Sequence, residues 1–504
     1  MPIKSPMLLK LSGIAFASCL SLTASAHSGM FPDTFRFDNS NEGRSVSIKD
    51  RFQQRAARGS STAQNCVDGL AGDYPCRNID LLSLLAPSEM GGGDSLLNDI
   101  WGWEDLVNGR EYAIVGRING TSFVDVTDPT TPIWIGFLPA HDGGADAWRD
   151  VKVYQDHAFI VADGFGNATH GLQVFDLRTL ATTTPGSTLS ETAHLGGFGP
   201  AHNIAINEDT GFAYVVGAYS DSNTGLPVCG GGLYMVDISS PQSPGFSGCF
   251  SSDGYTHDVQ CVVYAGPDSR YTGNEICFAY NEDTLTVVDV SNKNNPVQVS
   301  RTPYPGANYT HQGWLLDDNQ NYLVLNDETD EINTGANTTS HVFDISVLTS
   351  PDHIGSFTAE TAAIDHNLYT KDSYVFESNY RAGLRILSSD NIASGTLEER
   401  GYFDTVPCSD SAQFSGAWSN YPYLASGNIL ISDIESGLFV LRANSAALAA
   451  NDNDAEPAIS PVCDGAGVGG GSSGGGGGSS TIHIGVLILL ASLGIFSLFV
   501  LRRR

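Results

Sequence analysis

The feature that most constrains the fold is a segment that recurs along most of the chain. Its clearest copy runs from Tyr255 to Val299 and begins Thr256-His257-Asp258-Val259. The opening recurs as Ala201-His202-Asn203-Ile204, Thr310-His311-Gln312-Gly313 and Asp365-His366-Asn367-Leu368, and in weaker form around Trp101, Arg149 and Ala417. Anchors at positions 101, 149, 202, 257, 311, 366 and 417 are separated by 48, 53, 55, 54, 55 and 51 residues. Seven copies at one period indicate a repeat array.

Each copy contains four short apolar or alternating runs separated by Gly, Asn, Asp and Pro. Such runs are typical of strands and not of helices. A single four-stranded sheet cannot bury both of its faces, so neighbouring sheets must stack, and radial stacking produces a propeller. The sequence therefore predicts an all-β fold, a seven-bladed β-propeller of four-stranded blades over residues 78–445.

The seventh copy is one strand short. It supplies three runs, near residues 415–425, 428–433 and 437–442. Residues 78–86 are apolar and lead into Pro87, like the fourth run of an earlier copy at 132–139, which also ends in Pro. We therefore expect this N-terminal strand to fill the missing outer position and close the ring. A separate amphipathic helix is the alternative for these residues.

Both ends of the chain carry targeting signals. Residues 1–26 combine basic residues, an apolar run and Ala24-Ser25-Ala26, which predicts a signal peptide cleaved after Ala26. A lipoprotein signal ending at Cys19 is the alternative. Residues 482–501 are apolar enough to cross about 30 Å of hydrocarbon. The terminal arginines that follow place the end of this transmembrane helix, residues 482–504, in the cytoplasm.

The segments between these signals and the propeller differ in character. Residues 27–77 form a largely polar N-terminal extension that contains Cys66 and Cys76. Residues 446–481 form a linker whose second half is almost entirely Gly and Ser, a composition typical of flexible coil.

The exported part is strongly acidic. Without the two targeting segments it has 20 Lys and Arg against 56 Asp and Glu, a formal charge of −36. A surface of this charge repels nucleic acid and anionic lipid, so DNA and RNA are excluded as partners.

The cysteine count points to disulfides. Once Cys19 is removed with the signal peptide, the number left is even, as expected of a disulfide framework in an exported chain. The sequential pairs are our hypothesis: Cys66 with Cys76, Cys229 with Cys249, Cys261 with Cys277, and Cys408 with Cys463. A zinc site is the weaker interpretation, because the sequence contains no C-x-x-C.

Several runs of the repeat resemble a known family. Ser122-Phe123-Val124-Asp125-Val126 and Leu233-Tyr234-Met235-Val236-Asp237-Ile238 are similar to the bacterial LVIVD repeat. The segment from Cys66 to Cys76, followed by residues 78–83, resembles the entry to the choice-of-anchor B family. This resemblance covers about residues 60–445 and implies no established activity.

The tail resembles a GlyGly-CTERM sorting signal. That resemblance implies export by type II secretion in a Gram-negative bacterium, with transient anchoring in the inner membrane. Cleavage near the Gly run by a rhomboid-type sortase would follow, and the protein would end at the cell surface, at the outer membrane or in the medium.

Four histidines at equivalent repeat positions are the strongest candidates for a site: His202, His257, His311 and His366. We expect them at the start of the innermost strands, near one mouth of the central channel. Together with Asp150 and Asp258 they could bind a divalent metal ion, since imidazole and carboxylate are common ligands. Alternatively, each histidine hydrogen-bonds the backbone of its own blade and has a purely structural role.

Acidic residues recur as well. Those that end the third run of each copy are expected to accept backbone N–H groups from the following turn; they are Asp125, Asp176, Asp237, Asp289 and Asp344. The runs 317–321 and 326–331 resemble calcium loops but lack the EF-hand spacing, so we interpret them as turns and blade connections.

Two function classes stay open. The first is a non-enzymatic, exported, surface-anchored or released propeller that binds a protein, a glycan or a metal ion. The second is a metal-dependent hydrolase or lyase acting through the histidines at the channel mouth. The cofactor is calcium, a transition metal or none. The sequence lacks G-x-S-x-G, H-E-x-x-H and P-loop motifs, so standard hydrolase and nucleotide-binding interpretations have no support.

Overall fold

The computed structural model describes residues 63–449 except 94, 165–168, 221–225 and 317–318. These residues belong to the first of two compact units, Met1–Pro461. The predicted signal peptide, most of the linker and the predicted membrane helix lie outside the described residues. Within them, no helix has the length and apolarity needed to span a bilayer.

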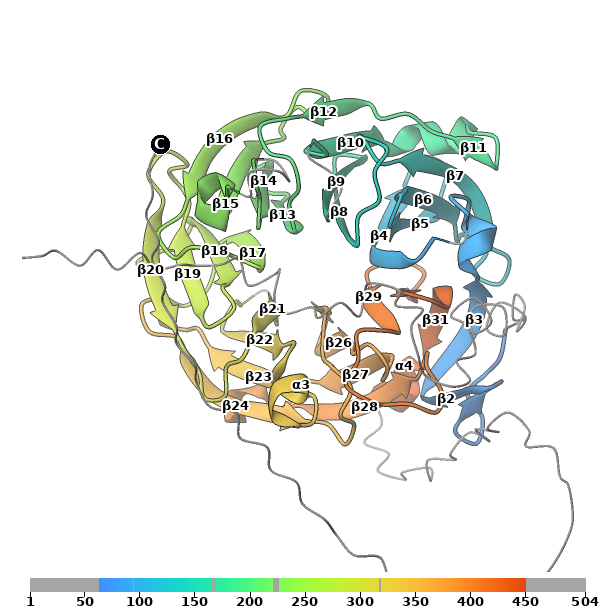
Figure 1. Cartoon of the computed structure of the whole chain (residues 1–504). Coiled ribbons are helices and arrows are strands. Elements are labelled where there is room, and N and C mark those ends of the chain that lie inside the picture. Colours follow the sequence, from blue (N-terminus) through green and yellow to red (C-terminus); the bar gives the residue numbers. More distant parts are fainter. Residues whose placement is uncertain (1–62, 94, 165–168, 221–225, 317–318, 450–504) are drawn as a thin grey trace, which may run out of the picture. The chain divides into compact units, whose positions relative to one another are not determined.

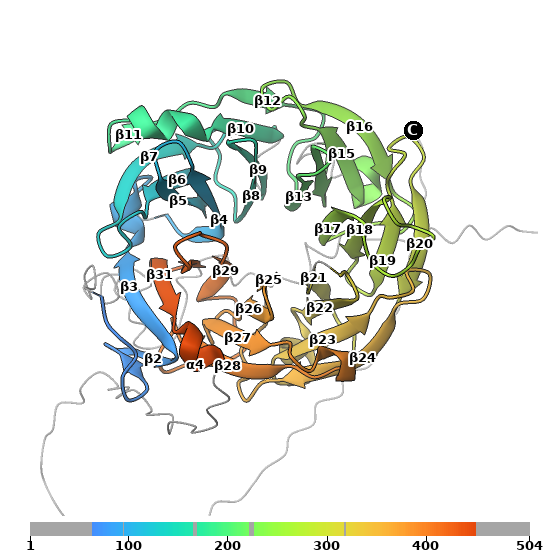
Figure 2. The same ribbon diagram turned by 180° about the vertical axis from the view of Figure 1, so that it is seen from behind.

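Seven antiparallel sheets form the described structure, arranged around a common centre (Figures 1 and 2). We number the blades by the order of their inner strands. Blade 1 comprises β4 Leu97–Asp105, β5 Arg110–Arg117, β6 Gly120–Asp125 and β7 Ile133–Pro139. Blade 2 comprises β8 Trp148–Tyr154, β9 His157–Asp163, β10 Leu172–Asp176 and β12 Ala193–Leu195. Blade 3 comprises β13 Asn203–Asn207, β14 Phe212–Val216, β15 Leu233–Asp237 and β16 Gly245–Phe250.

Blades 4 to 7 follow the same plan. Blade 4 comprises β17 Asp258–Val263, β18 Glu275–Tyr280, β19 Leu285–Asp289 and β20 Val297–Thr302, and blade 5 comprises β21 Thr310–Leu315, β22 Tyr322–Asp327, β23 Thr339–Asp344 and β24 Asp352–Thr358. Blade 6 comprises β25 Leu368–Lys371, β26 Tyr374–Ser378, β27 Leu384–Ser388 and β28 Glu398–Phe403. Blade 7 comprises β29 Ala417–Tyr421, β30 Asn428–Asp433, β31 Gly437–Ala443 and β3 Ile79–Leu85. The predicted seven-bladed β-propeller of four-stranded blades is therefore confirmed.

Burial along each blade follows its position between two neighbours. All six residues of the second strand β18 are buried, whereas no residue of the outer strand β20 is. Stacked sheets cover both faces of the inner strands, which explains why these strands are apolar without strict alternation. Each core cluster joins adjacent blades; for example, Tyr214 and Met235 of blade 3 pack with Val259 and Val288 of blade 4.

The inner strands meet around the centre. Each contacts the inner strand of the next blade, and β29 of blade 7 contacts β4 of blade 1. β3 pairs antiparallel with β31, so residues from the start of the propeller lie in the sheet of blade 7 (Figure 1). The alternative of a helix for residues 78–86 is therefore wrong.

Smaller elements decorate the sheets. β2 Tyr74–Arg77 pairs with the outer strand β28 and with β1 Leu70–Ala71, and β11 Ser187–Thr188 lies parallel to β7. The helices among the described residues are short: α3 Asp330–Thr334, α4 Ser445–Ala449, and the 3₁₀ helices Pro87–Met90, Leu177–Thr182, Val228–Gly231 and Ile392–Ser394.

Three of the sequential disulfides are present. Cys66 is bonded to Cys76, and Cys229 to Cys249. Cys261 and Cys277 are register partners on β17 and β18 and form the third bond. Cys408 is also disulfide-bonded, and its predicted partner Cys463 lies outside the described residues.

Candidate functional site

The four repeat histidines form a continuous row near the starts of four consecutive inner strands. The ring centroids of His202 and His257 are 4.3 Å apart, those of His257 and His311 are 4.3 Å apart, and those of His311 and His366 are 4.4 Å apart. All four side chains are buried, with exposed fractions between 2% and 5%. The equal spacing follows from the repeat, because equivalent positions in successive blades lie side by side around the centre.

Other residues flank the row in the remaining blades. His366 contacts Trp418 at 4.9 Å between centroids, and His202 faces Trp148 at 6.0 Å. Arg149, next to Trp148, is buried and forms an ion pair with Asp146. The row is therefore limited to one side of the ring, as the absence of histidine from the weaker repeats predicted.

Two of the histidines meet the backbone of the next blade through their side chains. Nδ1 of His257 lies 3.2 Å from the carbonyl oxygen of His311, and Nδ1 of His366 lies 2.5 Å from that of Trp418. Asn203 likewise donates its side-chain amide to the carbonyl of His257. For His257 and His366, the backbone carbonyl that the side chain meets therefore belongs to the next blade. Nε2 of His366 has a second partner.

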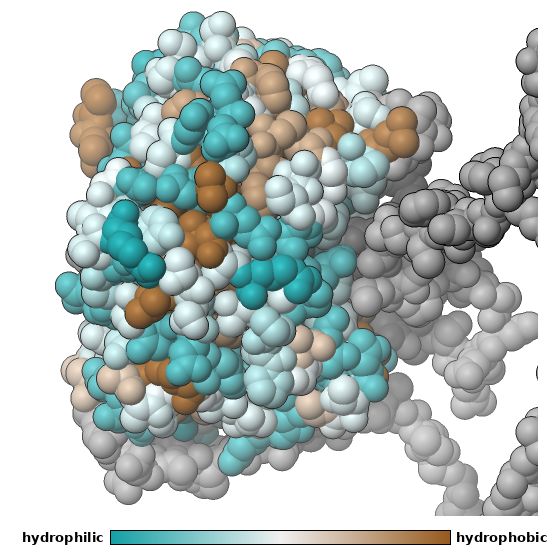
Figure 3. Space-filling view, turned by 90° about the vertical axis from the view of Figure 1, so that its left-hand side faces the viewer, coloured by the Kyte–Doolittle hydropathy of each residue, from teal (hydrophilic) through white to brown (hydrophobic). Residues whose placement is uncertain are grey.

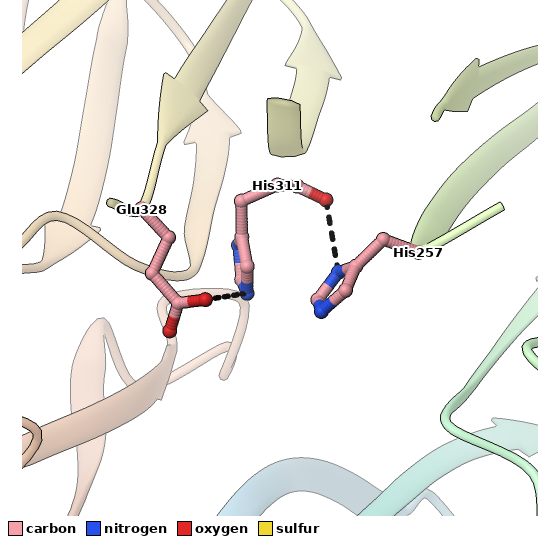
Figure 4. A group of neighbouring side chains, drawn as sticks. All are labelled: His257, His311 and Glu328. Atoms are coloured by element: carbon pink, nitrogen blue, oxygen red, sulfur yellow. Dashed lines mark hydrogen bonds and ion pairs between the residues drawn. The ribbon is translucent and has the colours of Figure 1, made fainter. Parts of the chain in front are cut away.

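That second partner is Glu328, in the loop between β22 and α3. Nε2 of His311 lies 3.6 Å from one carboxylate oxygen of Glu328, and Nε2 of His366 lies 3.4 Å from the other. The Tyr380 hydroxyl donates to the same carboxylate at 2.9 Å. Figure 4 shows His257, His311 and Glu328 converging, and one ligand atom from each lies within 4.8 Å of the others.

The electrostatics favour a neutral imidazole beside an acid that is hard to ionise. Burial lowers the pKa of His366 to about 3, so its ring is neutral at pH 7 and keeps a lone pair for a ligand. Burial raises the pKa of Glu328 to about 8, against the opposing effect of the Tyr380 hydrogen bond. A cation at this carboxylate would favour its ionised form.

The rim beside His202 is polar and partly exposed. Nδ1 of His202 lies 3.2 Å from the carboxylate of Asp163. The rings of His257 and Tyr309 meet edge to face at 5.0 Å, and Tyr309 shares a hydrogen bond with Glu282. Asp163, Tyr255 and Glu282 are half-buried. Two half-buried carboxylates and a half-buried phenol therefore lie near the His202 end of the histidine row.

The two predicted aspartates belong to a different group. The carboxylate of Asp150 accepts hydrogen bonds from the ammonium group of Lys152 at 2.5 Å and from the backbone N–H of Ile204 at 2.7 Å. Asp258 accepts the N–H of Val259, and burial followed by the nearby charge of Asp150 raises its pKa to about 8. Both therefore interact with the inner strands and Lys152, and neither belongs to the His257–His311–Glu328 group.

Two of the weaker anchors are misaligned. The residue beside His366 in the row is Trp418, one position after Ala417. Trp101 packs instead with Tyr369 and Tyr421, which follow His366 and Trp418 by three positions. The aromatic character of Trp101 suggested equivalence, but the register of β4 places it farther along its strand.

Sequence reasoning missed Glu328 and Tyr380. Glu328 lies within the acidic run 326–331, which we interpreted as a connection. The run was visible, but nothing in the sequence indicated that the end of a second strand would approach the start of an inner strand.

Comparisons with known proteins support the repeat. The LVIVD repeat model matches residues 198–251 and 272–302. No curated protein matches the chain. Two solved structures resemble it weakly: the β-propeller domain of Cps50 (Swd1) from Myceliophteria thermophila, with a TM-score of 0.42, 11% identity and coverage of 66% of this chain and 93% of that one; and the computationally designed Ika8 protein, with a TM-score of 0.42, 9% identity and coverage of 72% and 93%. With its matched segments and seven sheets, this chain is a seven-bladed β-propeller that carries LVIVD repeats.

Proposed function

We propose that this protein is an exported interaction module that binds a ligand at the histidine end of its propeller through a bound transition metal ion. The observation that carries this proposal is the buried convergence of two imidazoles, His257 and His311, with the carboxylate of Glu328. A rigid scaffold with functional groups at one end of its inner strands is suited to binding.

The donor set favours a transition metal over calcium. Imidazole nitrogen is a preferred ligand of zinc, copper, iron and nickel, whereas calcium takes oxygen ligands. Two imidazoles and one carboxylate leave a coordination position open, to which an external ligand can bind. His366 supplies a further imidazole beside Glu328.

The rim favours a hydroxyl-rich ligand. Tyr255 is half-buried and offers an aromatic ring and a hydroxyl, and the half-buried Asp163 and Glu282 offer acceptors. Sugars present apolar faces and many hydroxyl donors, which such a rim matches. We therefore expect an extracellular glycan before an extracellular protein.

The proposal includes the targeting features and the ring closure predicted from the sequence. The signal peptide ending at Ala26 would export the chain, and residues 482–504 would hold it in the inner membrane until a sortase releases it. The pairing of β3 with β31 supports the idea that residues 78–86 close the ring.

Metal content is the first test. The purified protein is exposed to Zn²⁺, freed of excess ion and analysed by mass spectrometry, beside a His257→Ala/His311→Ala variant. We expect about one equivalent in the wild type and loss of it in the variant, because a site with three protein ligands loses its affinity when two are removed. A His341→Ala/His353→Ala variant is the matched control, since this neighbouring pair lies on β23 and β24, outside the row.

Ligand binding follows on a glycan array with metal-loaded and chelated protein. Binding that requires both metal and the histidine pair supports the proposal; equal metal content in all three proteins contradicts it. A metal-dependent hydrolase is the second candidate, since two histidines and a glutamate can hold a catalytic zinc ion. It requires hydrolysis of ester or phosphoester probes by the loaded wild type and none by the histidine variant.

A further inference from the structure

Three other carboxylates meet in the interior of the propeller, next to the histidine site but separate from it in their atoms. Asp330 and Glu331 begin helix α3 in blade 5, and Asp365 precedes the inner strand β25 of blade 6. One oxygen from each side chain lies within 4.8 Å of the others. Two oxygens that each lie about 2.4 Å from one calcium ion can be no farther apart than this.

Asp365 has no partner for its charge. Its side chain is completely buried, and neither of its carboxylate oxygens accepts a hydrogen bond. Its own backbone N–H donates to Glu331 at 3.3 Å, which fixes the two side chains next to each other. Buried polar atoms in native proteins are almost always satisfied, so an orphaned pair of oxygens requires an explanation.

The surroundings increase the negative charge instead of neutralising it. The charged groups that act most strongly on Asp365 are all acidic: Glu331, Asp330, Asp327 and Glu377. Among the described residues, none of the three clustered carboxylates forms an ion pair with Lys, Arg or His.

From this geometry we infer that Asp330, Glu331 and Asp365 form a calcium site that joins blade 5 to blade 6. The donors are oxygens alone, which suits a hard cation and separates this site from the histidine site. Three carboxylates provide up to six oxygens, and calcium accepts six to eight. The ion would neutralise charges that would otherwise stay buried and opposed.

The inference predicts calcium-dependent stability and a specific terbium signal. Protein treated with a chelator is titrated with Ca²⁺ while its thermal unfolding is recorded, with Mg²⁺ as a parallel series. Tb³⁺, which replaces calcium in oxygen sites, is followed by luminescence sensitised through Tyr380 and Trp418, which pack with Ile364 beside the site. We expect a rise in melting temperature with Ca²⁺ and a Tb³⁺ signal that Ca²⁺ displaces.

Two neutral variants test the residues. Asp365→Asn and Glu331→Gln each keep the size of the side chain and remove one ligand charge, so each should bind Ca²⁺ at least about tenfold more weakly. Asp237→Asn is the matched control, because it removes one carboxylate charge from a turn of blade 3, outside the cluster, and should leave the calcium response unchanged.

The alternative is that the three groups share protons and bind no ion. In that case the wild type shows no calcium-dependent shift in melting temperature and no Tb³⁺ signal that Ca²⁺ displaces; either result overturns the inference, as does an unchanged response in both neutral variants. The His257→Ala/His311→Ala protein keeps the calcium response if the two sites are independent, so a failure of the transition-metal proposal is distinguishable from a failure of this one.

Discussion

Single buried carboxylates in this propeller differ in whether the fold satisfies them. Glu377 on β26 is buried and accepts hydrogen bonds from the Ser340 hydroxyl at 2.6 Å and the Asn379 amide at 3.1 Å. Asp365 is equally buried and accepts none. Glu377 is hydrogen-bonded, so its burial lowers stability only through the loss of hydration. Asp365 has no such bonds, so its charge needs a cation or a proton to be neutralised.

Glu377 should make stability depend on pH. Burial raises its pKa from 4.5 to about 7 in the folded protein, so the folded state holds the proton more tightly than the unfolded chain. Its contribution is complete below pH 4.5 and is lost as the pH rises to 7. Glu377→Gln stays neutral throughout, so its free energy of unfolding should gain about 3 kcal/mol relative to the wild type between pH 4 and pH 8.

Urea unfolding of both proteins at several pH values measures this difference, and groups common to both cancel. A difference that is constant with pH would show that Glu377 has the same pKa in the folded and unfolded states.

At the scale of the element, the hydrogen-bonded turn after the third strand of a blade recurs most regularly along the repeat. In five blades the aspartate that ends this strand accepts the N–H group two residues later, at 2.8 to 3.1 Å; the aspartates are Asp125, Asp176, Asp237, Asp289 and Asp344. The prediction from the sequence is confirmed, because this bond depends only on a residue and its immediate neighbours.

Asp237 offers a clean test of that turn, since its carboxylate accepts both the N–H and the hydroxyl of Ser239. Asp237→Ala should lower the free energy of unfolding by about 1 kcal/mol, because these bonds are lost. Asp237→Asn keeps a side-chain acceptor and should lose less than half of that. Denaturant unfolding compares the three proteins, and equal stabilities would mean that the turn forms without its cap.

The same scale explains what the sequence did and did not predict. Strands, turns and the histidine row follow from local pattern and repeat spacing, so they could be predicted. The positions of Trp101 and Ala417 could not, because bulges in β4 and β29 shift the register in a way that periodicity does not reveal. Glu328 meets His366, and Glu331 meets Asp365, only through the packing of blade 5 against blade 6.

At the scale of the whole molecule, the sheet of blade 7 contains a strand from the other end of the propeller. Deleting residues 60–90 would remove β3 and leave blade 7 with an exposed strand, β31. We expect the entire propeller to lose its cooperative transition, because blades that contact each other in a circle share their cores. Circular dichroism during heating measures this, and a transition of full amplitude in the shortened protein would contradict it.

The outer surface fits the role of a scaffold. Figure 3 shows hydrophilic side chains over most of one flank, with hydrophobic residues in small groups among them. A formal charge of −36, expected for the part between the two predicted targeting segments, would make molecules of this protein repel one another. Neither the net charge nor the surface shown in Figure 3 indicates a particular ligand. The amino-acid composition alone could therefore not locate the candidate site.

The pairing of β3 with β31 also constrains the order in which the propeller can fold during synthesis. Ile79 is made early, but its partner Ala443 appears 364 positions later. A ribosome makes the chain from its N-terminus, so β3 is made before β31, the strand with which it pairs. The sheet of blade 7 therefore cannot be complete until the other six blades have been synthesised, and this long sequence separation is of the kind that slows folding.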